Sequence, residues 1–182
     1  MAYKNKIITN PLVGQNIKFL QTAKDTGGKL LEMEAAYRPY SKEPPLHYHP
    51  HQEEDFLIIK GQMTVRLAGK ILLLNEGDTL HIPASTVHSM WNNSAGTAVV
   101  NWKVRPAMNT EYFFENASGL ASDKKRHKRM RSILQKSLLA NKYSRIFRLS
   151  RPSFFIQKLI FIILAPFGWL AGYRASYKRY MD

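Results

Sequence analysis

The stretch PPLHYHPHQEEDFLIIKG, residues 44–61, decides which fold is predicted for this chain. His47 and His49 are two residues apart, and residues two apart on a β-strand share one face of the sheet. Both imidazoles can therefore point into the same space. Glu54 follows beyond Pro50, at the start of a short apolar run that a second strand could bring back beside the two histidines. Two imidazoles and a carboxylate suit a borderline divalent metal such as Fe, Mn, Zn or Ni.

On both sides of this stretch the chain consists of short strand candidates, with no helical period before about residue 108. Glycine, asparagine or proline separates the candidates, and such punctuation is typical of a β-sandwich or barrel. The sequence therefore predicts a mainly β fold. The expected strands fall within residues 7–20, 29–38, 56–59, 63–67, 71–74, 79–82, 88–91 and 98–104.

A second stretch, GDTLHIPASTVHSMWN at residues 77–92, adds another histidine. His88 follows a turn at Pro83 and begins a short strand candidate. Taken alone, His88 would be an ordinary core or surface histidine. It becomes a metal-ligand candidate only through its partners in the first stretch.

Together the two stretches resemble the paired motifs of the cupin superfamily, in the short spacing of its compact bacterial members. The sequence departs from the family at Ser41 and Ser85, where glycine is usual. Serine at position 85 predicts less unusual backbone angles than glycine would adopt there. The motif residues are His47, His49, Glu54 and Gly61 in the first stretch, and Gly77, Pro83, His88 and Asn92 in the second.

The resemblance covers roughly residues 30–106 and implies a double-stranded β-helix, the jelly-roll architecture. It also implies a divalent metal held by His47, His49, Glu54 and His88. Positions left open for water or substrate distinguish a reactive metal site from a structural one. The competing interpretation is a barrel that keeps the motif for packing and binds no metal.

Two ligand assignments stay open, because strand parity is unreliable after a proline. His51 could take the place of His49, and Glu53 could take the place of Glu54. His81 has no partner at a suitable spacing and is predicted to be an ordinary strand residue.

Strand alternation also predicts the walls of a pocket. If Glu54 points inward, Phe56 shares its face, and Met90 shares the face of His88. Apolar walls are usual in small-molecule sites. An open metal in such a pocket can bind oxygen or a chelating acid, or polarise a carbonyl. The sequence therefore predicts a small organic ligand and a metal-dependent oxygenase or isomerase; the alternative is a non-catalytic sensor or carrier.

Charge divides the chain near Leu120. Residues 1–120 hold 12 Lys/Arg against 11 acids, whereas residues 121–182 hold 15 against 2, a net charge of +13. This shift predicts a cupin barrel over 1–120 and a basic, partly hydrophobic helical extension over 121–182. The absence of cysteine excludes disulfides and thiolate metal sites.

The extension is expected to be helical. Residues 110–117 predict a short helix whose aromatic side chains pack on the barrel. Ser122 is a candidate N-cap for a helix over about 123–148, which the basic residues 124–128 would open. Another helix follows Pro152, and its segment Leu159–Ala165 is apolar on every side, so it must be buried in protein or lipid.

Three environments are open for this apolar helix: the barrel or a second subunit, an anionic membrane surface, or a membrane span. Its uninterrupted apolar run, 159–171, is shorter than the ~20 residues that a span needs. The sequence predicts a homodimer and contact with an anionic membrane surface through residues 123–180. No recognised motif supports a nucleic-acid partner. Because no secretory signal is visible, the expected location is the cytoplasm, peripheral to the inner membrane.

Overall fold

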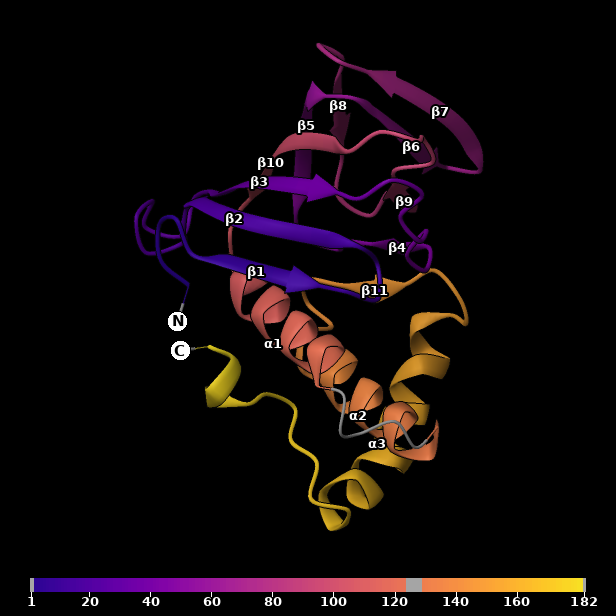
Figure 1. The fold of residues 1–182 in the computed structure, drawn as a ribbon. Coiled ribbons are helices and arrows are strands. Elements are labelled where there is room, and N and C mark those ends of the chain that lie inside the picture. The colour runs from indigo at the N-terminus through magenta and orange to yellow at the C-terminus, as the bar shows by residue number, and fades with distance from the viewer. Residues whose placement is uncertain (1, 124–128, 182) are drawn as a thin grey trace.

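Two antiparallel sheets face each other, and the helices gather at one end of the molecule (Figure 1). The computed structural model describes residues 2–123 and 129–181. One sheet has the order β1-β2-β3-β10-β5-β8 and the other β11-β4-β9-β6-β7. The strands are β1 (Ile7–Asn10), β2 (Gln15–Gln21), β3 (Leu31–Tyr37), β4 (His47–Tyr48), β5 (Glu53–Lys60), β6 (Gln62–Leu67), β7 (Lys70–Asn75), β8 (Thr79–Ile82), β9 (His88–Trp91), β10 (Ala98–Arg105) and β11 (Arg148–Leu149). The helices are α1 (Thr110–Ser122), α2 (Arg129–Lys142), α3 (Phe154–Leu170) and the 3-10 helix η2 (Lys178–Tyr180). The prediction of a mainly β jelly roll with C-terminal helices is confirmed.

The core lies between the sheets, and strand alternation builds it. In β3 and β10 every second residue is buried, because successive side chains of a strand point to opposite faces. The tight turn between β5 and β6 depends on Gly61, which has a φ of +76°. A Cβ at this position would lie 2.6 Å from the carbonyl oxygen of Thr97. The buried side chains include Phe19, Leu31, Met33, Ile58, Met63, Val65 and Val100.

The backbone of Ser85 does not have the ordinary angles that a serine at this position predicted. Its φ is +65°, in the left-handed region that glycine adopts most easily, so the prediction of ordinary angles was wrong. The Ser85 backbone N–H donates a 2.8 Å hydrogen bond to the carbonyl of His49, and the turn holds its shape with this bond. The other departure, Ser41, is buried and its hydroxyl accepts a hydrogen bond from the backbone N–H of Asn92.

The helix boundary predicted at Ser122 was also wrong. Ser122 is the last residue of α1, not the cap of the next helix. The first helix runs past its predicted end at residue 117 and includes Gly119, where the Tyr180 ring packs so closely that a Cβ would clash with it. α2 is described from Arg129 onward, and the predicted basic opening at residues 124–128 lies outside the described residues.

A buried ion pair ties α1 to the N-terminal strand region. Lys6 Nζ lies 2.7 Å from Glu115 Oε1, and the Glu115 side chain is fully buried. A buried carboxylate is tolerated because it is paired, and removing one partner of a buried pair is strongly destabilising.

Replacing Lys6 by Met is therefore expected to lower the free energy of unfolding by about 3 kcal/mol, since the Glu115 charge would stay buried without its partner. Urea denaturation monitored by circular dichroism measures this loss. Lys4→Met, at an exposed position two residues away, is the matched control and should change stability little. Equal stabilities of the two variants would show that the ion pair contributes nothing.

The extension adds a strand to the barrel. In β11, Arg148 pairs with Tyr48 and Leu149 with His47, both in β4. The next residue, Ser150, donates its backbone N–H to the carbonyl of Leu46. The basic extension thus lies directly beside one of the predicted ligand strands (Figure 1).

α3 packs on α2 along a narrow stripe. Phe161, Ala165 and Gly168 are buried, and Leu138 of α2 lies so close to Gly168 that a Cβ there would approach it to 2.9 Å. This contact covers only one side of a helix whose segment 159–165 is apolar all round. Among the described residues, no helix combines the length and the apolar character that crossing a membrane requires.

Candidate metal centre

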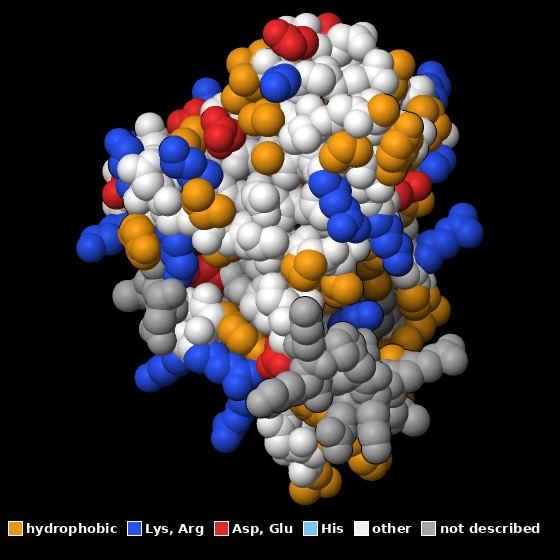
Figure 2. Space-filling model, in the orientation of Figure 1, with side chains coloured by type: hydrophobic (Ala, Val, Ile, Leu, Met, Phe, Trp, Pro, Cys, Tyr) orange, Lys and Arg blue, Asp and Glu red, His pale blue; other side chains and the backbone are white. Residues whose placement is uncertain are grey.

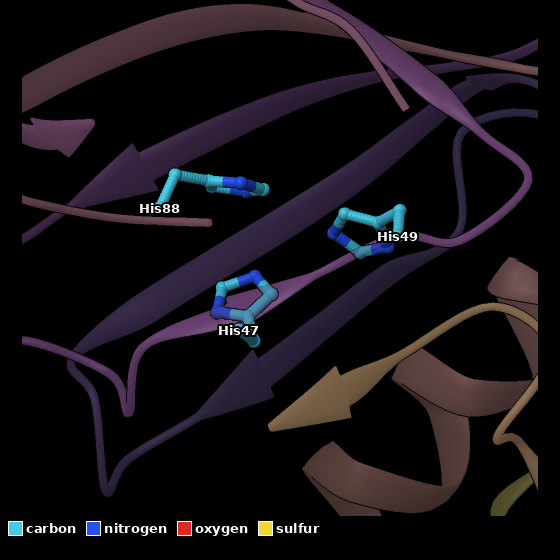
Figure 3. Close-up of side chains that lie close together, drawn as sticks. All are labelled: His47, His49 and His88. Carbon is cyan, nitrogen blue, oxygen red and sulfur yellow. The ribbon is translucent and has the colours of Figure 1, made fainter. Parts of the chain in front are cut away.

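Three histidines from the region of β4 and β9, neighbouring strands of the sheet β11-β4-β9-β6-β7, surround a common space (Figure 3). His47 lies in β4, His49 directly after this strand, and His88 at the start of β9. The register of β4 and β9 places His47 opposite His88. One nitrogen from each ring lies within 4.8 Å of the others, so a single ion could contact all three.

Backbone carbonyls hold all three rings in one tautomer. Because a carbonyl can only accept, the Nδ1 atom that contacts it must carry the proton. Each Nε2 is then left without a proton in the neutral ring, as a metal ligand requires. The Nδ1 atoms of His47, His49 and His88 donate to the carbonyls of Pro45, Ile146 and Thr86, respectively.

Glu54 completes the cluster from β5, with only 1% of its surface exposed. Its Oε2 lies 2.9 Å from His88 Nε2 and 3.5 Å from His49 Nε2. Among the described residues, Glu54 Oε2 and His49 Nε2 are buried polar atoms without a hydrogen-bond partner. Lone pairs that face each other at these distances repel unless a proton or a cation lies between them. A divalent cation therefore fits this donor set.

The pKa values of the cluster follow from burial and from the contacts between its members. Burial alone would raise the pKa of Glu54, but His49 and His88 outweigh it and lower this pKa to about 2. Burial together with the neighbouring imidazoles of His88 and His49 lowers the pKa of His47 to about 3. For His88, burial works downward, yet the Glu54 carboxylate raises the pKa overall. At neutral pH Glu54 is thus an anion and His47 a neutral ring.

The alternative ligands point elsewhere. His51 and Glu53 are both exposed, whereas His49 and Glu54 are buried in the cluster. Alternation along β5 explains the choice of glutamate, since Glu54 shares its inward face with Phe56. His81 lies in β8, where its Nδ1 is 2.8 Å from Asp55 Oδ1 on the outside of the sheet.

The second oxygen of Glu54 has a partner in the neighbouring strand. Trp102 in β10 donates its indole Nε1–H to Glu54 Oε1 over 3.0 Å. Phe56 stacks on the Trp102 ring with centroids 5.4 Å apart. Trp102 thereby orients the carboxylate so that Oε2 faces the imidazoles. The sequence analysis placed Trp102 only within the strand candidate 98–104, so it missed this role.

A cavity of about 210 Å³ opens beside the cluster. Phe56 and Met90, predicted as its walls, both line it. Most of the remaining surface is apolar, with Tyr37 and Gln15 among the few polar groups. Helix α1 closes one side with Phe113, Phe114 and Ala117, and the segment before β11 contributes Ile146 and Phe147.

Residues of the C-terminal extension contact the candidate ligands directly. The carbonyl of Ile146 is the acceptor for His49 Nδ1. The Phe147 ring stacks on His47 with centroids 4.8 Å apart and lies 6.3 Å from the ring of His49. Phe113 of α1 in turn stacks on the Phe147 ring, with the two ring centroids 5.2 Å apart. The sequence carried no local signal for these contacts, because they join residues about a hundred positions apart.

The second-motif asparagine has a structural role. Asn92 is fully buried, and its side-chain amide donates to the carbonyls of Tyr37, Arg38 and Gly96. It therefore ties the end of β9 to β3, and it does not line the cavity.

The fold is that of the cupin superfamily. Residues 33–103 match the family model described as a cupin domain, and the chain therefore carries a domain of the cupin superfamily. Quercetin 2,3-dioxygenase from Bacillus subtilis is 46% identical over 54 residues, which are 30% of this chain and only 16% of that relative. This chain therefore matches only a small part of the length of that curated relative.

Solved structures share the fold at low sequence identity. A predicted oxalate decarboxylase from Thermotoga maritima is 19% identical with a TM-score of 0.50, covering 57% of this chain and 92% of its own. KdgF from Halomonas sp. is 16% identical with a TM-score of 0.49, covering 57% of this chain and 89% of its own. These likenesses concern the architecture and not the reaction.

Proposed function

We propose that this chain binds one divalent metal ion through His47, His49, Glu54 and His88 and uses it to transform a small organic molecule in the adjoining cavity. The observation that carries the proposal is the donor set itself. Three Nε2 atoms with fixed tautomers meet a buried carboxylate oxygen that has no hydrogen-bond partner. A motif kept only for packing would not need unpaired buried lone pairs, which are costly.

The cavity favours a largely apolar, small substrate with one polar end. Its walls include the aromatic side chains of Phe56, Phe113 and Phe147, and the candidate ligands form its polar end. A substrate oxygen would therefore point toward the metal while the rest of the molecule packs against rings. When bound, the metal supplies Lewis acidity or a site for oxygen.

Tyr37 is the residue of this chain best suited to orient such a substrate. Its hydroxyl lies at the cavity wall and accepts a 2.6 Å hydrogen bond from Gln15. Burial raises the pKa of Tyr37 well above its ordinary value, so the hydroxyl keeps its proton at neutral pH. It can therefore donate that proton in a hydrogen bond to a substrate oxygen or carboxylate.

Oxygenation is the reaction class that we favour over isomerisation. The local similarity to an enzyme named quercetin 2,3-dioxygenase supports it. Among the described residues that line the cavity, only the candidate ligands carry a carboxylate or an imidazole, and the remaining titratable groups are Tyr37 and Lys42. An isomerase needs a base placed to move a proton between substrate atoms.

Metal analysis and oxygen uptake test this function. The purified chain should hold close to one divalent ion, and loading with Fe, Mn, Ni or Zn should raise its melting temperature, since an ion that binds only the folded state stabilises it. Oxygen consumption is then followed with a panel of hydroxylated aromatic and enolic compounds. Substoichiometric metal that His49→Ala does not change would overturn the metal site.

The alternative is a non-catalytic sensor or carrier that uses the same pocket. It is favoured by the enclosure of the cavity by α1 and the segment before β11, which suits retention of a ligand. Calorimetry separates the two functions: a sensor binds its ligand and releases it unchanged, whereas an enzyme consumes it in the presence of metal and oxygen.

The indole of Trp102 offers a test of the site that leaves every ligand in place. Trp102→Phe keeps the ring but removes the donor to Glu54 Oε1. We expect a 10–100-fold loss of metal affinity, the range seen when an outer partner of a ligand is lost. Competition with a chromogenic chelator measures it. Trp91→Phe in β9, whose ring contacts Arg66, is the control and should keep the affinity.

A further inference from the structure

Helix α3 presents its apolar residues to the outside and buries a polar one. Gln157 is only 4% exposed, and its side-chain amide donates to the carbonyls of Leu149 and Pro152. Nine large apolar side chains of the helix are exposed by 38 to 86%. These side chains define the α3 apolar face: Phe155, Ile156, Leu159, Ile160, Ile162, Ile163, Phe167, Trp169 and Leu170.

Leaving such an apolar face exposed to water is unfavourable in free energy. Burying one large aliphatic or aromatic side chain is worth about 1.5–3 kcal/mol in transfer free energy. Contiguous exposed apolar patches on a protein mark a binding surface. Figure 2 shows hydrophobic side chains at the end of the molecule where Figure 1 places α3. The face therefore indicates a partner that the described residues of this chain do not provide.

We propose that the α3 apolar face docks on the interface of an anionic lipid bilayer. The charge around the face selects this partner. Lys158 lies on the helix itself, Arg151 precedes it and Arg174 follows it, and all three are exposed. The sequence from 124 to 181 contains no aspartate or glutamate, so nothing in it opposes attraction to lipid phosphates.

The same charge argues against a second copy of this chain as the partner. Two copies joined through α3 would bring together two extensions that each carry a net charge of +13. Like charges across an interface cost several kcal/mol, and residues 124–181 contain no acids to offset them. A bilayer of anionic lipids supplies both the apolar layer and the opposite charge.

The length of α3 and the place of its tryptophan indicate that it lies along the surface. A helix of 17 residues is about 25 Å long, and no helix in the described ranges is suited to cross a membrane. Trp169, near the C-terminal end, is 65% exposed, and tryptophan prefers the boundary between headgroups and acyl chains. The opposite side of α3 stays packed on α2 through Leu138 and Gly168.

The helix is firmly joined to the barrel, so docking would hold the whole cupin domain at the membrane. Gln157 ties its first turn to β11, and β11 pairs with β4. Arg148 of β11 places its guanidinium 3.6 Å from the ring centroid of Phe154. This inference does not rest on the proposed metal chemistry, and either can fail without the other.

Vesicle binding by the full chain tests the proposal. Phosphatidylcholine vesicles with a third phosphatidylglycerol are compared with pure phosphatidylcholine in cosedimentation experiments at low and high salt. We expect binding to the anionic vesicles, weakening as salt screens the attraction. Trp169 fluorescence should shift to the blue with the same vesicles, and Trp169→Phe should remove this shift.

Matched variants separate the α3 face from hydrophobicity in general. Leu159→Gln with Ile163→Gln should weaken vesicle binding at least about tenfold. The control is Ile71→Gln with Leu73→Gln on β7, whose side chains are 53% and 55% exposed, close to the 51% and 55% of the α3 pair. The control should bind as the wild type does, and circular dichroism verifies that both variants fold.

Three outcomes would overturn the proposal. The first is absence of vesicle binding, or equal binding to neutral and anionic vesicles. The second is light scattering that shows a dimer lost in the α3 variant and retained in the β7 variant, without lipid binding. The third is an acidic protein that binds the α3 face while vesicles do not.

Discussion

Replacing His88 by Gln should lower the affinity for divalent metal by more than about 100-fold, beyond the 10–100-fold that an outer partner contributes. His88 Nε2 lies 2.9 Å from Glu54 Oε2, at the centre of the cluster. Glutamine nearly preserves the volume, and its amide N–H can donate to the buried carboxylate, so the fold should survive. Isothermal titration with the metal, or chelator competition, measures the loss.

The matched control is His81→Gln. His81 lies in β8 and pairs with Asp55 on the outside of the sheet, away from the cavity. It should bind metal as the wild type does, and its melting temperature should rise with metal, whereas that of His88→Gln should not. Equal metal affinity in the two variants would mean that the cluster is not the metal site.

The second large effect is expected at Phe147, which lies outside both cupin motifs. Phe147→Ala removes the ring that stacks on His47 at 4.8 Å and opens the wall of the cavity. The metal affinity should fall about tenfold or more, because ligand orientation depends on such outer contacts. The metal-free protein should lose roughly 2 kcal/mol of stability, less than a fully buried phenylalanine would cost.

Phe155→Ala serves as the control for Phe147→Ala. Phe155 is the same residue type in α3, is 79% exposed and touches none of the candidate ligands. It should keep both the metal affinity and the stability measured by urea denaturation. If Phe147→Ala also keeps its metal affinity, the extension only covers the cavity and does not position the ligands.

Local sequence patterns were enough to predict much of the fold and part of the candidate site. Burial alternates with a period of two in β3, β5 and β10, so a strand prediction also predicts which side chains share a face. The expected strands overlap β1 to β3 and β5 to β10, whereas β4 is not among them and β11 lies at the end of the segment predicted as the helix 123–148. Glu54, not Glu53, faces the core. The spacing of the two motifs indicated the cupin fold that the structure has.

Other features were not predictable from local patterns. Ser85 has a left-handed backbone and donates a hydrogen bond to the His49 carbonyl, and the Tyr180 ring packs against Gly119 of α1. The donor to Glu54 is Trp102, which the sequence placed only within a strand candidate. Each of these contacts joins parts of the chain that are far apart in sequence.

The sequence by itself determined the candidate ligand types, the mainly β fold and the basic character of the extension, because residue type, strand period and charge can all be read locally; the resemblance of its motifs to the cupin superfamily implied the jelly roll. Only the tertiary structure decided how the extension is used. β11 pairs with the strand of His47, and the Ile146 carbonyl and the Phe147 ring reach the candidate ligands. Tertiary packing also decided that α3 buries Gln157 and leaves its apolar face outside. Strand pairing and helix packing between distant segments have no periodic signature in a single sequence, so the stretch 44–61 alone could not show what closes its site.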